Sequence, residues 1–350
     1  MAERLAAHTT LRVGGPARAW VEPESEADLI EVVRAADEAG EPLLVLGGGS
    51  NVVVADAGFP GTVVHTGRLR GVHTEDVAAC AGAFINVAAG EPWDAFVAET
   101  IGRRQVGIEA LSGIPGLVGA TPIQNVGAYG QEVSQTIARV RVYDRQEHRI
   151  VTRATVDCHF GYRRSLFKAI PDRFVVLSVS FQFRLGTMSE PVRYGELARA
   201  LGIEPGTRAP MVEVRQAVLE LRRGKGMVLS ADDHDTWSAG SFFTNPLVSA
   251  AVAAGLPPDA PRYPQPDGTV KTSAAWLIEH AGFSRGYGPG LARISTKHSL
   301  ALTNRGGATT AELLELARQV RDGVQNAYGV LLVAEPVLIG TSLSDPGGVS

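Results

Sequence analysis

The sequence predicts a chain of the α+β class, with mixed α/β elements arranged in two or three domains. Its 350 residues exceed what one ordinary hydrophobic core holds. The chain opens with a strand–helix–strand pattern, continues through a β-rich stretch at about 67–185 and closes with amphipathic helices. Its glycine-rich loops match neither the GxGxxG fingerprint of a Rossmann fold nor a Walker A motif, so another type of fold must carry them.

The first predicted elements form a small β-α-β unit. Ala17–Val21 is a predicted strand, and Ser25 with Asp28 forms a capping box that begins a helix. Gly40 ends this helix, and a short buried strand follows at 42–46. The apolar face of the helix consists of Leu29, Val32, Val33 and Ala36.

The middle of the chain carries the clearest strand signal. RFVVLSVSFQF, at 173–183, is apolar and rich in β-branched and aromatic residues, as strands are. IARVRVYD at 137–144 and HRIVT at 148–152 are its expected antiparallel neighbours.

Three helices are predicted in the last third of the chain, at 213–223, 274–281 and 311–328. The last has a capping box made by Thr309 and Glu312, an apolar stripe and a glycine at its end. The tail SLSDPGGVS is expected to be disordered.

Composition excludes several classes of protein. Charged residues make up 20% of the chain and the net charge is −4, so neither nucleic acid nor an anionic membrane is an expected partner. No apolar run approaches 18 residues, and the N-terminus lacks the apolar core of a signal peptide. Cys80 and Cys158 lack metal-ligand spacing, so we expect no metal and a reducing, cytoplasmic location.

Two glycine loops are the first candidates for a binding site. LGGGSNVVVADAGFPG, at 46–61, follows a predicted strand, and its glycines let backbone N–H groups approach a ligand closely. The alternative is a plain glycine turn between strands, since VVVADAG is itself a predicted strand. The second loop, at 107–132, is long for a compact domain and contains apolar residues, which disfavours its alternative, an irregular surface loop. Together the loops indicate a long ligand with phosphates and a flat apolar body, a dinucleotide.

Seven segments in the same order give the chain a resemblance to a known family. They are HTTLRVGGPA, LGGGSNVVVAD, SGIPGLVGATPIQNVGAYGQE, FGYRRSLFK, GSFFTNP, KTSAAWLIEHAGF and GVLLVAEPVLIG. Over about residues 8–340 the chain resembles UDP-N-acetylenolpyruvoylglucosamine reductase, also called UDP-N-acetylmuramate dehydrogenase. The segment VRYGEL, with Tyr194, resembles the loop of the longer form of this family.

The resemblance implies a non-Rossmann FAD-binding fold of two subdomains plus a C-terminal substrate-binding α/β domain. Residues 1–66, joined by about 330–342, would be the first FAD-binding subdomain and 67–190 the β-rich second. Residues 205–329 would bind substrate, and 343–350 would be the disordered tail. FAD would be bound without a covalent link, because no Cys or His stands where such a link is expected. The implied cofactor-binding residues are Gly47, Gly48, Gly49, Ser50, Asn51, Ser112, Pro115, Gly116, Gly119, Ala120, Gln124, Asn125, Gly127, Ala128, Tyr129 and Gly130.

The implied reaction belongs to the synthesis of peptidoglycan precursors. NADPH would reduce FAD, and the reduced flavin would pass a hydride to C3 of the enolpyruvyl group of UDP-N-acetylglucosamine enolpyruvate. C2 would then be protonated, which gives UDP-N-acetylmuramate. Such a site needs an acid, a cation and a second polar stabiliser.

The resemblance places Ser241, Arg163 and Glu335 in these roles. Ser241, beside two phenylalanines, would donate the proton; taken alone, it could equally cap a turn. Arg163 would pair with the substrate carboxylate, and alignment on GYR selects it over Arg164; the alternative is a surface arginine. Glu335 would be the second stabiliser, or else a structural partner of a buried base. The chain has VAEPV where the family has LEPEV. Glu335 therefore corresponds to the family's catalytic glutamate if the second glutamate of that pattern is the functional one.

Tyr194, Lys225 and Asn245 are the implied positions that contact the diphosphate and the nucleotide-sugar substrate; an exposed lysine is the alternative for Lys225. Lys271 and His298 are weaker candidates. Two other functions stay open: a flavin oxidase that uses oxygen, and a non-catalytic sensor of a flavin or nucleotide sugar. A monomer is expected.

Overall fold

The computed structural model describes residues 2–78 and 81–344. Its α-helices are α1 (Glu26–Glu38), α2 (Trp93–Gly102), α3 (Leu166–Ala169), α4 (Gly195–Ala200), α5 (Met211–Gly224), α6 (Ala250–Gly255), α7 (Ala274–His280) and α8 (Thr310–Tyr328). Its strands are β1 (Ala17–Val21), β2 (Leu43–Leu46), β3 (Val52–Val54), β4 (Phe59–His65), β5 (Val72–Ala78), β6 (Gly82–Ala88), β7 (Gln105–Val106), β8 (Gly127–Ala128), β9 (Gln131–Glu132), β10 (Ile137–Asp144), β11 (Arg149–Ala154), β12 (Phe174–Leu185), β13 (Leu247–Val248), β14 (Arg262–Pro264), β15 (Val270–Thr272), β16 (Ala292–Ile294), β17 (Leu302–Asn304) and β18 (Val337–Ile339).

The chain divides into two compact units. Unit 1 consists of Met1–Ala17, Gly49–Phe59 and Lys225–Ser350, and unit 2 consists of Arg18–Gly48 and Pro60–Gly224. Both units contain helices and strands, and the mixed content confirms the expected α+β class. Among the described residues, no helix has the length and apolar character needed to cross a membrane. The tail was expected to be disordered from residue 343, and residues 345–350 of it lie outside the described residues. Cys80 also lies outside them.

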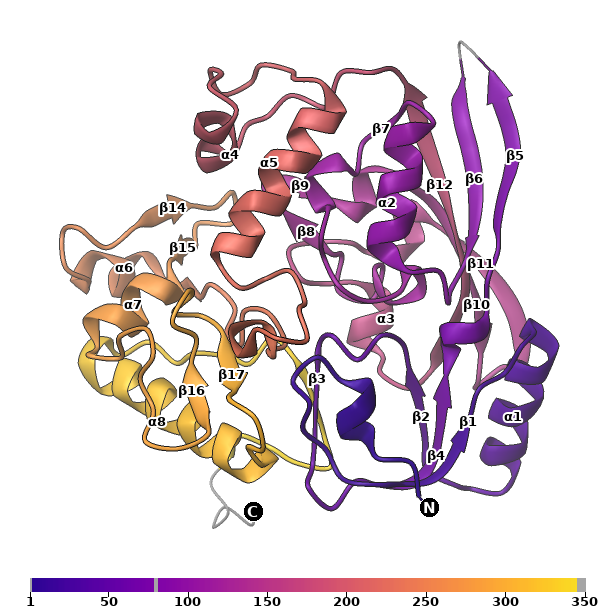
Figure 1. The fold of residues 1–350 in the computed structure, drawn as a ribbon, viewed down its shortest axis with the longest axis horizontal. Coiled ribbons are helices and arrows are strands. Elements are labelled where there is room, and N and C mark those ends of the chain that lie inside the picture. Colours follow the sequence, from indigo (N-terminus) through magenta and orange to yellow (C-terminus); the bar gives the residue numbers. More distant parts are fainter. Residues whose placement is uncertain (1, 79–80, 345–350) are drawn as a thin grey trace. The chain divides into compact units, whose positions relative to one another are not determined.

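Unit 2 is built on an antiparallel sheet with the strand order β11-β10-β12-β6-β5 (Figure 1). The apolar segment predicted as a strand is its central and longest member, β12, and the two expected neighbours are β10 and β11. Helix α2 packs on this sheet through aromatic rings: the Phe96 ring centroid lies 5.2 Å from that of Phe181 and 6.1 Å from that of Phe183. Burial of such large rings is the main stabilising contribution to this core.

A second, smaller sheet in unit 2 has the order β1-β4-β2 and carries α1. The predicted capping box is present, because Ser25 accepts a hydrogen bond from the Asp28 amide and Asp28 accepts one from the Ser25 amide. Leu29 and Val33 of α1 are fully buried and share a core cluster with Leu177 of β12. Helix α1 therefore packs against the larger sheet as well as the smaller one.

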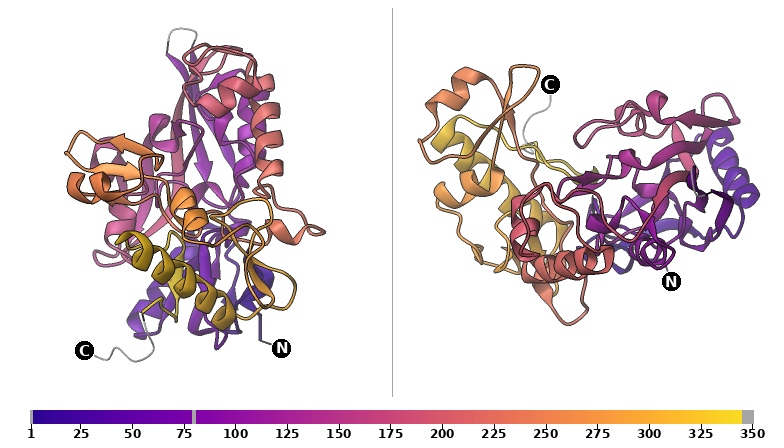
Figure 2. Two further views of the ribbon diagram at one scale, coloured as in Figure 1. Left: turned by 90° about the vertical axis from the view of Figure 1, so that its left-hand side faces the viewer. Right: turned by 90° about the horizontal axis from the view of Figure 1, so that it is seen from above.

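The core of unit 1 lies between α7, α8 and the β16–β17 hairpin (Figure 2). Helix α8, drawn in yellow, begins at the predicted capping box of Thr309 and Glu312 and ends at Gly329, whose φ of 67° is left-handed. Phe242 and Phe243 are each 1% exposed in this core. The parallel pair β3–β18 joins the chain near residue 53 to the chain near residue 338.

Asp144, at the end of β10, is a fully buried carboxylate of unit 2. Its fully buried side chain accepts hydrogen bonds from Arg173 Nε and, at 2.7 Å, from Arg173 Nη2. Arg173 therefore holds the pKa of Asp144 below its usual value of 3.8, although burial acts in the opposite direction. Because the pKa is lowered on folding, the stability from this pair is present above about pH 4 and is lost as the pH falls below it.

We predict that Asp144→Ala lowers the free energy of unfolding by about 3 kcal/mol, because it removes the buried acceptor of the Arg173 guanidinium and of the Gln146 amide and leaves Arg173 with the more exposed Glu147. Glu147→Gln, which alters the exposed second partner of Arg173, serves as the control and is expected to cost less than about 1 kcal/mol. Urea unfolding at pH 7 measures both. If the free energy of unfolding falls equally in the two variants, the buried pair of Arg173 with Asp144 is no more stabilising than the exposed pair with Glu147.

Candidate functional site

The two glycine loops touch each other in unit 2. A Cβ atom on Gly48, directly after β2, would lie 2.7 Å from the Cα of Gly116 in the second loop. Gly119 is equally confined, since its Cβ would lie 2.5 Å from the Cβ of Ala89. Gly47 has more room, with Ala120 as its nearest neighbour at 3.7 Å. Two loops that were predicted separately as binding elements are thus brought together by contacts that only glycine permits.

The first loop continues into unit 1 at Gly49. This residue has a φ of 59°, and a Cβ on it would lie 1.9 Å from the carbonyl oxygen of His8. Ser50 and Asn51 are half-buried, and Asn51 Nδ2 donates to the carbonyl oxygen of Glu335 at 3.4 Å. The loop therefore connects the glycine contact of unit 2 to the backbone of a predicted catalytic residue in unit 1.

Asp94 anchors the start of the second loop, and sequence reasoning missed it. Its Oδ1 accepts hydrogen bonds from the Gly113 amide at 2.6 Å and from Arg215 Nη1 at 2.6 Å; Oδ2 accepts from Arg215 Nη2 at 2.9 Å. Burial works to raise the pKa of Asp94, but Arg215 and the Gly113 amide outweigh it and the pKa is lowered. Ser112, fully buried, donates to the carbonyl oxygen of Glu109 at 2.7 Å. Its hydroxyl thereby fixes the loop from within.

Asn125 is the structural centre of the second loop. Its Nδ2 donates to Glu132 Oε2 at 2.8 Å and to the Gly161 carbonyl oxygen at 3.1 Å, while its Oδ1 accepts from the Ser134 amide. With a side chain 1% exposed, Asn125 holds backbone together rather than facing a ligand. Gln124, beside it, accepts from Lys168 Nζ at 3.3 Å.

The end of the second loop is a short hairpin. Gly127 and Ala128, in β8, pair with Gln131 and Glu132, in β9. Tyr129 and Gly130 form the turn, both with positive φ. Most of the loop's apolar residues are buried or half-buried as expected, with Ile123 as the exception at 38% exposed. Pro115 is half-buried beside Gly116.

Arg163 lies at the tip of a tight turn in unit 2. Gly161 and Arg164 exchange two backbone hydrogen bonds, of 3.0 and 3.1 Å, so Tyr162 and Arg163 project from the turn. Arg163 has a φ of 52°, a left-handed conformation that costs a non-glycine residue about 1–2 kcal/mol. The Asn125–Gly161 hydrogen bond and a hydrogen bond from Ser165 to the Ile123 carbonyl tie this turn to the second loop. The structure therefore brings Arg163, and not its neighbour Arg164, to the turn tip beside the predicted cofactor loop.

Tyr194, which precedes α4, lies against the same loop. Its ring meets that of Tyr129 edge to face, with centroids 5.5 Å apart and planes at 89°. Burial raises the pKa of Tyr129 to about 12, so its hydroxyl stays protonated and can donate at neutral pH. Burial also lowers the pKa of Arg222, on α5, although the nearby Asp94 carboxylate acts in the opposite direction. Arg222 is a cation near the predicted loop that the sequence pattern gave no reason to select.

Ser241 and Glu335 lie on adjacent backbone segments of unit 1. Phe243 forms an antiparallel bridge with Ala334, and the Glu335 amide donates to the Phe242 carbonyl oxygen at 2.8 Å. Glu335 is 8% exposed and Ser241 is half-buried, and Phe242 and Phe243, which follow Ser241 in the chain, belong to the core. Two residue types that can take part in proton transfer are thus held on neighbouring segments next to the core.

The other predicted substrate residues of unit 1 are less confined. Asn245 Oδ1 accepts from the Ala274 amide at 3.0 Å, at the start of α7. Lys225 and Lys271 are half-buried. Arg163 and Tyr194 belong to unit 2, whereas Ser241, Glu335, Asn245 and Lys225 belong to unit 1. Among the described residues, no group of three or more His, Cys, Asp or Glu side chains could hold a metal ion.

Two known protein families match different parts of the chain, one the part with the glycine loops and the other the part with Ser241 and Glu335. Residues 17–153, which run from β1 into β11 and contain both glycine loops, match the family described as "FAD binding domain". Residues 232–339, which contain Ser241 and Glu335, match "UDP-N-acetylenolpyruvoylglucosamine reductase, C-terminal domain".

Individual relatives match over almost the whole chain. Proteins named UDP-N-acetylenolpyruvoylglucosamine reductase from Cutibacterium acnes and Streptomyces avermitilis are 57% and 53% identical, and both alignments cover 97% of this chain. They cover 90% and 94% of those proteins. The crystal structure of UDP-N-acetylenolpyruvylglucosamine reductase from Thermus caldophilus superimposes with a TM-score of 0.65 at 25% identity, over 97% of this chain and 99% of that one. Because identity this high extends over nearly the full length, the chain belongs to the UDP-N-acetylenolpyruvoylglucosamine reductase family.

Proposed function

We propose that this protein uses FAD and NADPH to reduce UDP-N-acetylglucosamine enolpyruvate to UDP-N-acetylmuramate. The observation that carries the proposal is that Ser241 and Glu335 lie on adjacent backbone segments, joined by the hydrogen bond from the Glu335 amide to the Phe242 carbonyl oxygen, within a chain whose relatives bear the name of this reductase. Bound FAD would supply hydride transfer from NADPH to C3 of the enolpyruvyl group. The protein must bind the nucleotide sugar, stabilise the charge that develops beside the carboxylate, and protonate C2.

The residues of the two loops fit a bound FAD. A side chain on Gly48 would collide with the backbone of Gly116, and Gly116 has a φ of 120° that favours glycine, so the two loops can meet backbone to backbone. We infer that backbone amides of these loops contact the diphosphate. Gly47, Gly49, Ser50 and Asn51 would contact the cofactor from the first loop. From the second loop, Pro115, Gly116, Gly119, Ala120, Gln124, Gly127, Ala128, Tyr129 and Gly130 would do so, with Ser112 and Asn125 fixing the loop.

Three side chains would act on the substrate. The Ser241 hydroxyl, next to the buried Phe242 in the chain, donates the proton to C2. The Arg163 guanidinium pairs with the enolpyruvyl carboxylate in bidentate fashion and steadies the negative charge that arises after hydride transfer. Glu335, held in a largely apolar stretch, is the second stabiliser of that transition state.

Tyr194, Lys225 and Asn245 would bind the nucleotide-sugar portion. Lys225 supplies a point charge for the diphosphate, and Tyr194 offers a phenol that is 45% exposed. We further propose that residues 1–66 with about 330–342, and residues 67–190, form the two cofactor-binding subdomains, and that 205–329 bind substrate. The parallel pairing of Val337–Ile339 with Val52–Val54 supports the link between the first and last of these segments.

A monomer in the cytoplasm that binds no nucleic acid completes the proposal. A net charge of −4 supports the last point, because it provides no general attraction to phosphate backbones. Light scattering coupled to gel filtration is expected to give a mass near 36.9 kDa; a mass of twice that value would overturn the monomer.

The proposed reaction is tested by following where hydrogen enters the product. We predict that the protein, NADPH and UDP-N-acetylglucosamine enolpyruvate together give a product heavier by two hydrogen atoms, with one NADPH oxidised per product. In D2O, proton NMR is expected to show deuterium at C2, because that hydrogen arrives as a solvent-derived proton. NADPH oxidation that yields hydrogen peroxide and unchanged nucleotide sugar would contradict the proposal.

A further inference from the structure

We propose that Asp235 is a positioning residue for proton donation, because it holds the segment that presents Ser241. This inference rests on the proposed role of Ser241. We call residues 237–243 the serine segment and residues 295–301, which connect β16 to β17, the 295–301 turn. Asp235 lies in a 3-10 helix, His234–Thr236, immediately before the serine segment.

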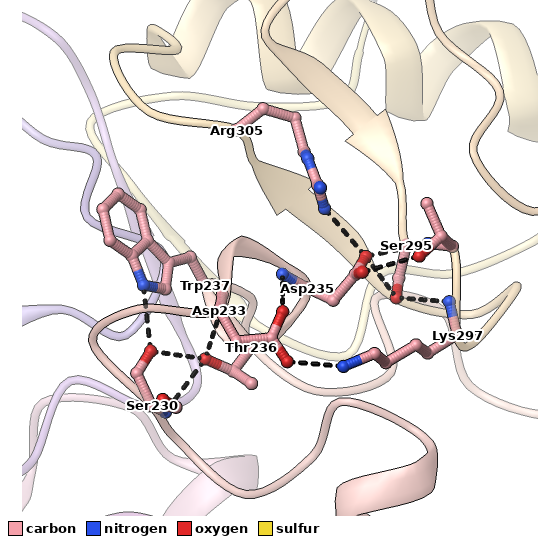
Figure 3. A network of polar contacts seen from close by, with 9 residues as sticks. Ser230, Asp233, Asp235, Thr236, Trp237, Ser295, Lys297 and Arg305 are labelled. Atoms are coloured by element: carbon pink, nitrogen blue, oxygen red, sulfur yellow. Dashed lines mark hydrogen bonds and ion pairs between the residues drawn. The ribbon is translucent and has the colours of Figure 1, made fainter.

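The Asp235 carboxylate is enclosed by donors from the 295–301 turn and from the end of the hairpin. The side chain is 6% exposed. Its Oδ1 accepts from Ser295 Oγ at 2.9 Å, from the Thr296 amide at 2.8 Å and from Arg305 Nη1 at 2.8 Å, and its Oδ2 accepts from Thr296 Oγ1 at 2.6 Å (Figure 3). Burial acts to raise the pKa of Asp235, but these four donors outweigh it and lower the pKa, so the group is ionised and anchored at neutral pH.

One route from Asp235 to Ser241 passes through the 295–301 turn. The carboxylate fixes the first two residues of the turn, and the turn closes through a 2.8 Å hydrogen bond from the Ser295 amide to the Ala301 carbonyl oxygen. The Leu300 carbonyl oxygen of the same turn accepts from the Phe242 amide at 2.7 Å. Phe242 is the neighbour of Ser241 and also accepts from the Glu335 amide. The position of the turn therefore sets the backbone next to the proposed proton donor.

A second route follows the chain itself. The Trp237 carbonyl oxygen accepts from the Asn304 amide at 3.0 Å, and Ser238 forms an antiparallel bridge with Thr303. Thr10 Oγ1 donates to the Ser238 carbonyl oxygen at 2.7 Å. Asp235 binds Arg305, which directly follows β17, so the chain just before the serine segment is also held next to β17. Both ends of the serine segment thus depend on a hairpin whose turn Asp235 holds.

Asp233 provides a matched control on the same short helix. Its Oδ2 pairs with Lys297 Nζ at 2.5 Å, also on the 295–301 turn, but its side chain is 34% exposed (Figure 3). Its Oδ1 caps the 3-10 helix by accepting from the Asp235 amide, a role that an asparagine oxygen also fills. Asp233→Asn therefore removes a negative charge close to the same turn while leaving the buried contacts of Asp235 in place.

The first experiment measures the anchoring directly, without cofactor or substrate. Hydrogen–deuterium exchange of a peptide spanning 238–246 is followed in wild type, Asp235→Asn and Asp233→Asn. In Asp235→Asn we expect the Phe242 amide to exchange at least about tenfold faster, because its acceptor turn has lost its strongest fixing contacts. Asp233→Asn is expected to match wild type. Unchanged exchange in Asp235→Asn, or equal acceleration in both variants, would overturn the inference.

The second experiment separates the two half-reactions of the FAD-loaded enzyme. Misplacing a catalytic group by about 1 Å can slow its step by about 100-fold. We therefore expect Asp235→Asn to slow flavin re-oxidation by the enolpyruvyl substrate about 10- to 100-fold, with flavin reduction by NADPH within about twofold of wild type. Thr296→Val deletes the hydroxyl that donates to Asp235 Oδ2 and is expected to slow the same step less. This milder variant still tests the inference if Asp235→Asn fails to fold.

Ser241→Ala, run in parallel, separates failure of this inference from failure of the proposed function. If Ser241→Ala is slow in re-oxidation and Asp235→Asn is as fast as wild type, the positioning role of Asp235 is wrong and the proposed function stands. If Ser241→Ala re-oxidises at the wild-type rate, Ser241 is not the donor and the inference falls with that assignment. Equal slowing of both half-reactions in Asp235→Asn would show a general structural role and would also overturn the inference.

Discussion

Ser241→Ala is expected to slow re-oxidation of the reduced flavin by UDP-N-acetylglucosamine enolpyruvate about 1,000-fold, and to leave reduction by NADPH unchanged. The serine hydroxyl is a weak acid, so it is useful only against a strongly basic carbon in a place that water does not reach easily. Phe242 and Phe243, which follow Ser241 in the chain, are each 1% exposed, so the apolar core begins directly beside it. Loss of a positioned general acid typically costs about 10²–10⁴ in rate.

Ser249→Ala is the matched control for this substitution. Ser249 is an exposed serine in the same unit, and its hydroxyl caps α6 by accepting from the Val252 amide. Its removal is expected to cost about 1 kcal/mol of stability and no activity in either half-reaction. Re-oxidation in Ser241→Ala within about tenfold of wild type would mean that another group or water donates the proton.

Gly48→Val is expected to weaken FAD binding by about 5- to 150-fold. Its Cβ would lie 2.7 Å from the Cα of Gly116, and this neighbour is backbone that cannot rotate away. Relieving such a contact by moving the loops costs about 1–3 kcal/mol, which corresponds to roughly 5- to 150-fold in a dissociation constant. The protein should therefore lose much of its bound flavin during purification.

The control for Gly48→Val is Gly102→Ala in the same unit. A Cβ on Gly102, the last residue of α2, meets no atom within 4 Å. Equilibrium dialysis with FAD should give a wild-type dissociation constant for Gly102→Ala. A wild-type value for Gly48→Val as well would show that the contact between the two glycine loops does not shape the cofactor site.

Local patterns in the sequence predicted much of the fold because the physics that sets them is local. The capping boxes at Ser25 and Thr309 begin α1 and α8, and β12 is the apolar strand that was expected. Boundaries shifted by a residue or two, as at α5, which begins at Met211 rather than at residue 213. VVVADAG was predicted as one strand, but β3 ends at Val54. Asp56 in it instead accepts hydrogen bonds from the amides of Thr310 and Ala311 at the start of α8.

The residues that the sequence did not predict act through partners far away along the chain. Asp94 holds Gly113 only because Arg215, 121 positions later, pairs with the same carboxylate. Asp235 depends likewise on Arg305, 70 positions later. Such charges have no periodicity and no motif of their own, so their roles emerge only from the folded chain. The roles of Ser241, Arg163 and Glu335 came from the family resemblance and stay predictions.

The most direct test of the proposed function is an anaerobic stopped-flow experiment on the wild-type protein. FAD in the enzyme is first reduced with one equivalent of NADPH, and UDP-N-acetylglucosamine enolpyruvate is then added without oxygen while the visible absorbance of the flavin is followed. Recovery of the oxidised spectrum on addition of the nucleotide sugar is the predicted result. A flavin that stays reduced until oxygen enters would contradict it and would favour the alternative of a flavin oxidase.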